Sequence, residues 1–241
     1  MTIRQVAVLL LTLAASPLIA GEFSGPQGFS FAFPEGWIAL SEQDRQNMGL
    51  AENELIQRAK IDLTLIAVLV VQPGNDDFCP SFNVVVNSPE TPINEKAKDE
   101  ILSIVSTKLR SVGMTVIEPT AEIRKIGANS VIVMDYRSLI PAMPFELRQR
   151  QVIFTGGGKN FVVTCCAKAT EFDAVSPAFD SMLASFKVPP PTVSSAPFGG
   201  FGLKDNLISG AIGGAICGAI AGAVGGGIAA FKLLLKKKKS A

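Results

Sequence analysis

Few side chains in this sequence could do chemistry, because its 241 residues include no histidine. Histidine is the commonest general base and the commonest metal ligand, so its absence also removes every serine–histidine or cysteine–histidine pair. The adjacent thiols of Cys165 and Cys166 are the only plausible nucleophiles. We therefore predict a non-enzymatic protein with no catalytic, cofactor-binding or metal site. An exported enzyme that uses a cysteine nucleophile is the alternative.

Three cysteines, Cys79, Cys165 and Cys166, lie outside the last apolar segment, which contains Cys217. In an oxidising compartment Cys79 could form a disulfide with one of the adjacent pair. Equally, all three could be small apolar residues in or near strands. The sequence leaves both interpretations open. Without histidine or help from carboxylates, these cysteines make no zinc site.

Charged side chains alternate along two stretches that we predict to be neighbouring strands. Asp135 and Arg137 share a face of the first strand, and Glu146, Arg148 and Arg150 share a face of the second. If the strands pair through a short turn, Asp135, Arg137, Arg148 and Arg150 form a patch where an arginine fork binds a carboxylate or phosphate of a partner. The alternative is a solvated ladder of cross-strand ion pairs, each contributing a few tenths of a kcal/mol.

A sheet is needed to hold these side chains together. Runs of β-branched and aromatic residues predict strands at residues 29–33, 64–71, 81–87, 116–123, 130–139, 146–154 and 160–168. An apolar face with helical spacing predicts a helix over residues 93–112. Phenylalanines at spacings of three and four predict a second helix, from Phe172 to Phe186, which Ser176 caps ahead of Pro177. The pattern indicates an α+β fold with the helices packed on an antiparallel sheet.

Two turns punctuate this pattern. The four residues Gly156–Lys159 predict a hairpin loop, because they lack the glycine spacing of a phosphate loop. The stretch Pro34-Glu35-Gly36 predicts a turn before Trp37, the only tryptophan. Trp37 is either a core residue or an exposed anchor for a partner.

The order of these motifs resembles a PsbP-like domain. A phenylalanine-rich strand runs into Pro34-Glu35-Gly36-Trp37, a long helix follows, and a strand with Arg148-Gln149-Arg150-Gln151 precedes the Gly156 hairpin and a closing helix that ends at Phe186. The resemblance covers about residues 23–188 and extends to bacterial periplasmic domains of the DcrB type. It implies an antiparallel sheet between helices (an α/β/α sandwich) and a role in binding or assembly, and it supplies no catalytic residues.

The first residues have the pattern of a secretory signal peptide. Arg4 precedes an apolar run over residues 6–13, and a small residue stands at Ala20 after Pro17. Leu18 occupies a place where cleavage prefers a small residue, so an uncleaved anchor is the alternative. Many bacterial relatives of the PsbP-like type are lipoproteins, whereas no cysteine stands near residue 20 here.

A second apolar segment, residues 207–231, contains no side chain that is charged at neutral pH and is followed by Lys232 and by lysines at 236–239. At about 1.5 Å per residue it is long enough to cross a hydrocarbon core of roughly 30 Å. Glycines recur in it at every fourth position, which lets a second helix approach closely. The predicted helix-association residues are Gly210, Gly214, Gly218, Gly222 and Gly226.

The predicted organisation follows from these segments. It comprises a signal peptide (1–20), an exported PsbP-like domain (21–188), a proline- and glycine-rich linker (189–206), a transmembrane helix (207–235) and a basic cytoplasmic tail (236–241). The lysines place the C-terminus in the cytoplasm and the domain on the periplasmic or extracytoplasmic side.

The net charge of +1 conceals an acidic exported part. Residues 21–205 contain 16 Lys and Arg against 21 Asp and Glu, which is unsuited to nucleic acid. We expect as partners the lipid bilayer and either a protein or a second copy, and we identify no small-molecule substrate. The predicted function is binding or assembly on a partner protein or envelope complex, with self-association through the glycines. A membrane-perturbing glycine zipper is a further alternative.

Overall fold

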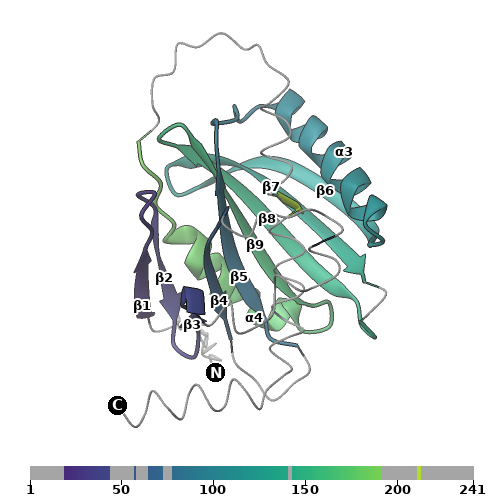
Figure 1. Ribbon diagram of the computed structural model, residues 1–241, viewed down its shortest axis with the longest axis horizontal. Coiled ribbons are helices and arrows are strands. Elements are labelled where there is room, and N and C mark those ends of the chain that lie inside the picture. Colours follow the sequence, from purple (N-terminus) through teal and green to yellow (C-terminus); the bar gives the residue numbers. More distant parts are fainter. Residues whose placement is uncertain are drawn as a thin grey trace, which may run out of the picture.

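A seven-stranded antiparallel sheet is the centre of the molecule (Figure 1). The computed structural model describes residues 19–43, 57, 65–72, 78–140, 143–190 and 211–212. The strand order is β3-β4-β5-β9-β8-β7-β6, and β1 and β2 form a separate two-stranded hairpin. The strands are β1 Ile19–Ser24, β2 Ser30–Pro34, β3 Ile38–Ala39, β4 Ile66–Val71, β5 Ser81–Asn87, β6 Thr115–Ile126, β7 Asn129–Leu139, β8 Leu147–Gly156 and β9 Lys159–Lys168. The helices α3 (Glu95–Ser111) and α4 (Phe172–Ala184) complete the predicted α+β fold, which is confirmed.

The strands β6 to β9 form a meander in which each strand pairs with the next along the chain. The β8–β9 turn contains Gly157 and Gly158, both at positive φ, where a side chain would be strained. The predicted hairpin at Gly156–Lys159 is therefore confirmed. On its other side β9 pairs with β5, so β9 lies between strands from both halves of the domain.

One face of the sheet packs against α3. The helix α3 begins after Asn94, whose side-chain oxygen accepts a hydrogen bond from the Ala97 amide at 2.9 Å. The buried side chains Ile101, Val105 and Leu109 recur at helical spacing and enter a core cluster with side chains from the sheet. The predicted helix over residues 93–112 is confirmed within two residues at its start and one at its end.

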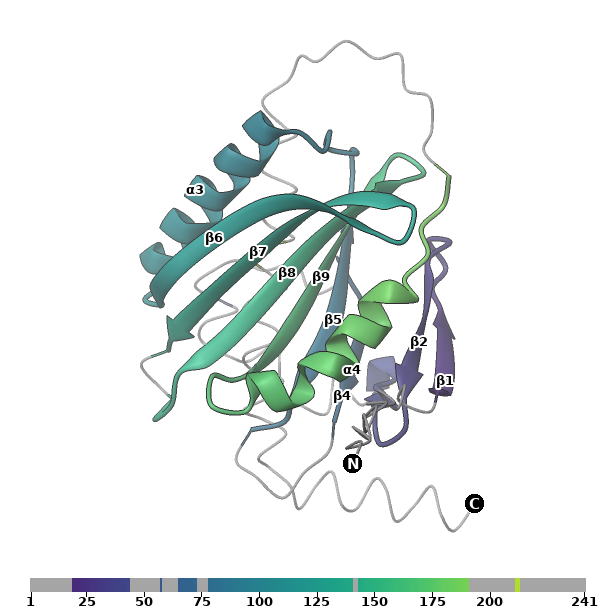
Figure 2. The ribbon, with the colours of Figure 1, turned by 180° about the vertical axis from the view of Figure 1, so that it is seen from behind.

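The opposite face packs against α4 and the β1–β2 hairpin (Figures 1 and 2). Phe29 and Phe31 of the N-terminal hairpin are buried there beside Phe186, which follows α4. Trp37 is also buried, with its ring 5.5 Å from that of Phe179. Trp37 is thus a core residue and not an exposed anchor.

The predicted cap of α4 is wrong. The helix begins at Phe172, so Ser176 is not its N-cap and Pro177 lies inside it. Proline lacks the amide that would bind the carbonyl of Asp173 four residues earlier. The Ser176 hydroxyl donates to that carbonyl instead, at 3.1 Å, and so the helix tolerates the proline.

Several predicted segments lie outside the described residues. These are residues 1–18 of the signal peptide, residues 191–206 of the linker, the basic tail 236–241 and most of the transmembrane segment 207–235, including Gly210, Gly214, Gly218, Gly222 and Gly226. The strand β1 contains the last two residues before the predicted cleavage site. Within the described ranges, no helix is both long and apolar enough to span a bilayer.

Candidate functional site

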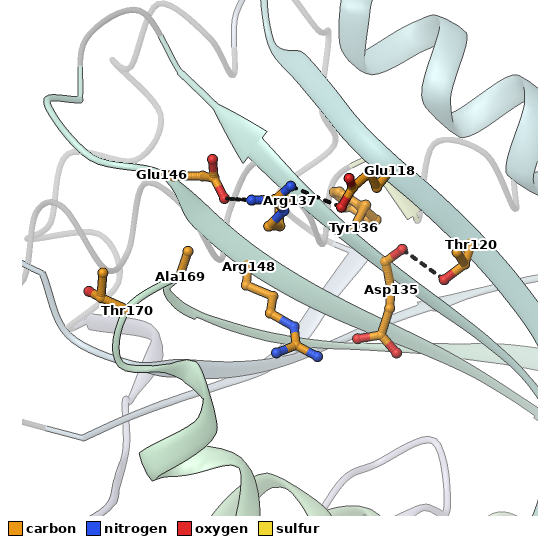
Figure 3. A pocket seen from close by; sticks show the side chains of 9 residues that line it. All are labelled: Glu118, Thr120, Asp135, Tyr136, Arg137, Glu146, Arg148, Ala169 and Thr170. Carbon is orange, nitrogen blue, oxygen red and sulfur yellow. Dashed lines mark hydrogen bonds and ion pairs between the residues drawn. The ribbon is translucent and has the colours of Figure 1, made fainter.

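A pocket of about 600 Å³ opens on the α4 side of the sheet, over β6, β7 and the start of β8 (Figure 3). Figure 2 shows that α4 lies over the β9, β5 and β4 side of this face and leaves β6 and β7 without a helix. The turn after β9, with Ala169 and Thr170, closes one end. The other lining residues are Glu118, Thr120, Asp135, Tyr136, Arg137, Glu146 and Arg148.

A bulge in β6 forms one wall of the pocket. The register of β6 on β7 shifts between Ile117 and Thr120, and Glu118 adopts a φ of 48°. Pro119 cannot donate to the ladder, so a regular strand is interrupted at this point. Glu118 is the one non-glycine residue in the described part of the chain with a positive φ, and the strained backbone carries its carboxylate to Arg137.

Arg137 is held by two carboxylates from different elements. In the register of β7 on β8 it lies opposite Arg148, and like charges in that position repel. Its Nη2 is 2.9 Å from Glu118 Oε2, and its Nη1 is 3.0 Å from Glu146 Oε1. The hydrogen bond to Glu118 and the charge of Glu146 raise the pKa of Arg137, so it stays charged at every accessible pH.

Arg150 joins the sheet to α4. Its Nε is 3.1 Å from Asp135 Oδ2 on β7, directly across the ladder, and its Nη1 is 3.0 Å from Asp180 Oδ1 on α4. Burial works to lower the pKa of Arg150, but the charge and the hydrogen bond of Asp135 outweigh it, so the pKa is raised. Arg150 of β8 is therefore linked to β7 through Asp135 and to α4 through Asp180.

Arg148 lies at the first turn of α4. Its Nη1 is 2.9 Å from Asp173 Oδ1, and its guanidinium carbon is 4.6 Å from the centre of the Phe172 ring. An acidic side chain at a helix N-terminus is favoured by the helix dipole, so Asp173 is stabilised by both the helix and the arginine. The stacking on Phe172 fixes the plane of the guanidinium at the pocket.

The four residues predicted as a patch, Asp135, Arg137, Arg148 and Arg150, do lie together on one face. Each of the three guanidinium groups forms at least one ion pair. Five carboxylates pair with these three cations, so negative groups outnumber positive ones. The outermost groups are acidic, because the side chains of Glu118, Asp173 and Asp180 are 76%, 88% and 59% exposed. Glu118 lines the pocket, and Asp173 pairs with Arg148, which also lines it, so exposed carboxylates stand at its rim.

Sequence reasoning missed Glu118, Asp173, Asp180 and Phe172 as parts of this site. Three of them belong to α4, and Asp173 and Asp180 lie 25 and 30 residues beyond the arginines that they contact. The signal for Glu118 was Pro119, since a proline inside a strand pattern indicates a bulge or an edge.

The three cysteines in the described part of the chain are buried, and none of them forms a disulfide. Cys165 and Cys166 are consecutive in β9 and so point to opposite faces of the sheet, Cys165 towards α4 and Cys166 towards α3. Of the two interpretations that the sequence left open, the structure has the buried thiols and forms no disulfide between Cys79 and either of them. Burial raises the pKa of Cys165, an effect that the charge of Arg150 only partly offsets, and burial also raises the pKa of Cys166.

These raised pKa values predict that the folded protein loses stability at alkaline pH. The unfolded chain releases the thiol protons near the ordinary pKa of 9.0, whereas the folded chain keeps them. Stability is therefore fully present below about pH 9 and declines above it, by up to about 1.4 kcal/mol per pH unit for each thiol. Urea unfolding at pH 8, 9 and 10 measures this decline. The double variant Cys165→Ala, Cys166→Ala should flatten it, and an unchanged alkaline slope in that variant would contradict the assignment.

Among the described residues, no group of three or more cysteine, aspartate or glutamate side chains is arranged to hold a metal ion. The arginines at the pocket could orient an anion, but each is engaged by a carboxylate of the same chain. The arrangement can therefore exchange ion pairs with charged groups that enter the pocket.

Comparison with known proteins finds partial likenesses among solved structures. No family model matches the sequence, and no curated protein matches it. The solution structure of a cyanobacterial PsbP from Synechocystis sp. PCC 6803 matches with a TM-score of 0.48 and 18% identity, over 70% of this chain and 91% of that one. LpqN of Mycobacterium tuberculosis, described as involved in cell envelope biogenesis, matches with 0.43 and 13%, over 70% and 91%. A Bacteroides thetaiotaomicron protein matches with 0.43 and 12%, over 69% and 47%. Likenesses of this size do not place the chain in a family and carry no function over to it.

Proposed function

We propose that this chain is a non-enzymatic, membrane-anchored, exported domain that binds or assembles a partner protein, and that the pocket beside the β6 bulge holds a basic segment of that partner. The observation that carries the proposal is the open, acid-rimmed pocket in which every arginine is already paired. An approaching lysine or arginine meets Glu118 and Asp173 first, because these carboxylates are the most exposed.

Charge supports a basic partner over an acidic one. The exported residues 21–205 carry an excess of acidic side chains, so the long-range field attracts cations. A partner carboxylate would have to displace Glu118 or Glu146 from Arg137, whereas a partner guanidinium or ammonium can add to the free faces of Glu118 and Asp173. The sequence hypothesis of an arginine fork for a carboxylate or phosphate is therefore replaced by this proposal.

The backbone of Glu118 gives a second line of support. A non-glycine residue at a φ of 48° costs about 1–2 kcal/mol. Such strain is found mainly at functional sites, where the backbone conformation sets the direction of a side chain. Here it directs the exposed carboxylate of Glu118 across the mouth of the pocket to Arg137.

The membrane part of the proposal comes from the sequence. The apolar residues 207–235 and the lysines after them form the anchor, and Gly210, Gly214, Gly218, Gly222 and Gly226 mediate self-association in the bilayer. The resemblance of the motifs to PsbP-like domains favours binding over turnover. A cysteine enzyme is disfavoured, because Cys165 and Cys166 are fully buried and burial raises the pKa of both thiols.

Crosslinking in membranes tests the pocket. A photoreactive residue in place of Thr170, which lines the pocket, should form an adduct with a partner protein, and Glu118→Lys should reduce that adduct about tenfold or more. The expected size follows because like charges brought together in an interface cost several kcal/mol, and each 1.4 kcal/mol is about a factor of ten. The adduct is identified and quantified by mass spectrometry.

Glu122→Lys is the matched control, because Glu122 stands on the same strand, makes the same change of charge and does not line the pocket. It should leave the adduct unchanged. An adduct that survives Glu118→Lys, or that falls equally in Glu122→Lys, would exclude the pocket as the binding site.

A further inference from the structure

Two residues of the glycine-rich segment, Ala211 and Ile212, are buried in the exported domain. Ala211 is fully buried and Ile212 is 7% exposed, and both belong to the core cluster on the α3 face of the sheet. Both are helical. The start of the predicted membrane anchor is thus packed on the sheet, on the face opposite to the pocket.

A buried glutamine of β8 holds this point of the chain. Gln151 Nε2 donates to the backbone carbonyl of Ala211 at 2.6 Å and also lies 3.3 Å from Thr164 Oγ1. Gln151 is completely buried, and its Oε1 has no hydrogen-bond partner among the described residues. The contact is made to a backbone oxygen, so it recognises the chain itself and not a particular side chain.

Gln151 stands at the β8 end of a row of three buried polar side chains on the α3 face. In the register of the sheet, Asn83 of β5 pairs with Thr164 of β9, and Thr164 pairs with Gln151 of β8. All three side chains are fully buried. Polar side chains in this position are costly unless something supplies hydrogen bonds, and the carbonyl of Ala211 supplies one. The small side chain at 211 lets the backbone come that close.

We infer that this polar row is an intramolecular docking site for the start of the chain's own glycine-rich segment. Ala211 and Ile212 cannot be buried in the domain and in a bilayer at the same time, so the sheet and the lipid compete for them. The inference goes beyond the proposed function and does not depend on the pocket or on a partner.

A photocrosslinker of leucine size at position 212 tests the docking in the full-length protein. The protein is compared in detergent-free buffer and after addition of vesicles of phosphatidylcholine and phosphatidylglycerol. We expect an intramolecular crosslink from position 212 to peptides of the core cluster on the α3 face, and a several-fold lower yield when vesicles are present. No such crosslink in either condition would overturn the inference.

Gln151→Leu should reduce the intramolecular crosslink several-fold, because it removes the hydrogen bond to Ala211. Gln149→Leu is the matched control, since Gln149 is equally buried on the same face of β8 but bonds the Tyr136 hydroxyl, at 2.7 Å, instead of Ala211. Equal losses in the two variants would overturn the role of Gln151. If neither variant folds, the wild-type crosslink still decides the docking. A docked segment in a protein that never partitions into vesicles would refute the anchor of the proposed function while leaving the docking intact.

Discussion

Phe186→Ala should lower the free energy of unfolding by about 3–5 kcal/mol, as expected for a large aromatic side chain removed from a core that cannot collapse. The Phe186 ring lies 4.7 Å from that of Phe154, 5.6 Å from Phe29 and 5.9 Å from Phe31. These partners come from the sheet and from the N-terminal hairpin, so the cavity would lie between two layers. Each aromatic pair adds to the cost of the lost burial.

Urea unfolding followed by the fluorescence of Trp37, the single tryptophan, measures this loss. Trp37 is buried against Phe179 and so reports on the same core. Phe33→Ala is the control, because Phe33 is only partly buried at the edge of the cluster and its ring lies 6.4 Å from that of Phe31. A loss for Phe186→Ala that is no larger than the loss for Phe33→Ala would contradict the central place of Phe186.

Asn160→Ala should destabilise the protein by roughly 3 kcal/mol or more. The buried amide of Asn160 donates to Asn87 Oδ1 at 2.9 Å and to the Pro89 carbonyl at 2.7 Å, and its oxygen accepts from the Thr91 amide at 2.7 Å. Alanine leaves these groups without their partner, and each orphaned buried group costs about 1–3 kcal/mol. The same unfolding measurement gives the value.

Asn160→Asp separates the acceptor role of the side-chain oxygen from the donor role of the side-chain nitrogen. It keeps the oxygen that accepts from Thr91 but places a second oxygen against Asn87 Oδ1 and the Pro89 carbonyl, so it should also be strongly destabilising. Asn129→Ala, at the partly exposed start of β7, should change stability by less than about 1 kcal/mol. A loss below about 1 kcal/mol for Asn160→Ala would show that the segment after β5 is not held by this side chain.

Much of the fold could be predicted from local patterns. The strands β5, β7 and β9 were predicted within one residue of their observed bounds at each end, because β-branched runs ended at turns with glycine or proline. The helix α3 was predicted from its apolar face and its long polar surface. Each of these patterns lies within the element itself, so the element can be predicted without knowing its contacts in the fold.

What the sequence did not reveal depends on distant contacts. The cap of α4 was misassigned because Ser176 before Pro177 is a good cap signal, and only the structure shows the hydroxyl bonded to the Asp173 carbonyl. The charged patch was predicted from the alternation on β7 and β8. The ion pairs of Arg148 with Asp173 and of Arg150 with Asp180 could not be predicted, because no pattern in the neighbouring sequence shows that α4 packs against β8.

The N-terminal hairpin also pairs with the segment that follows α4. Ser30 and Lys187 exchange two backbone hydrogen bonds, at 3.1 and 2.8 Å, beside the stacked rings of Phe29 and Phe186. Lys187 is synthesised 157 residues after Ser30. Until Phe186 and Lys187 have been made, Phe29 and Phe31 lack their native neighbours from the segment after α4, so this layer of the core cannot be completed before nearly the whole domain has been synthesised.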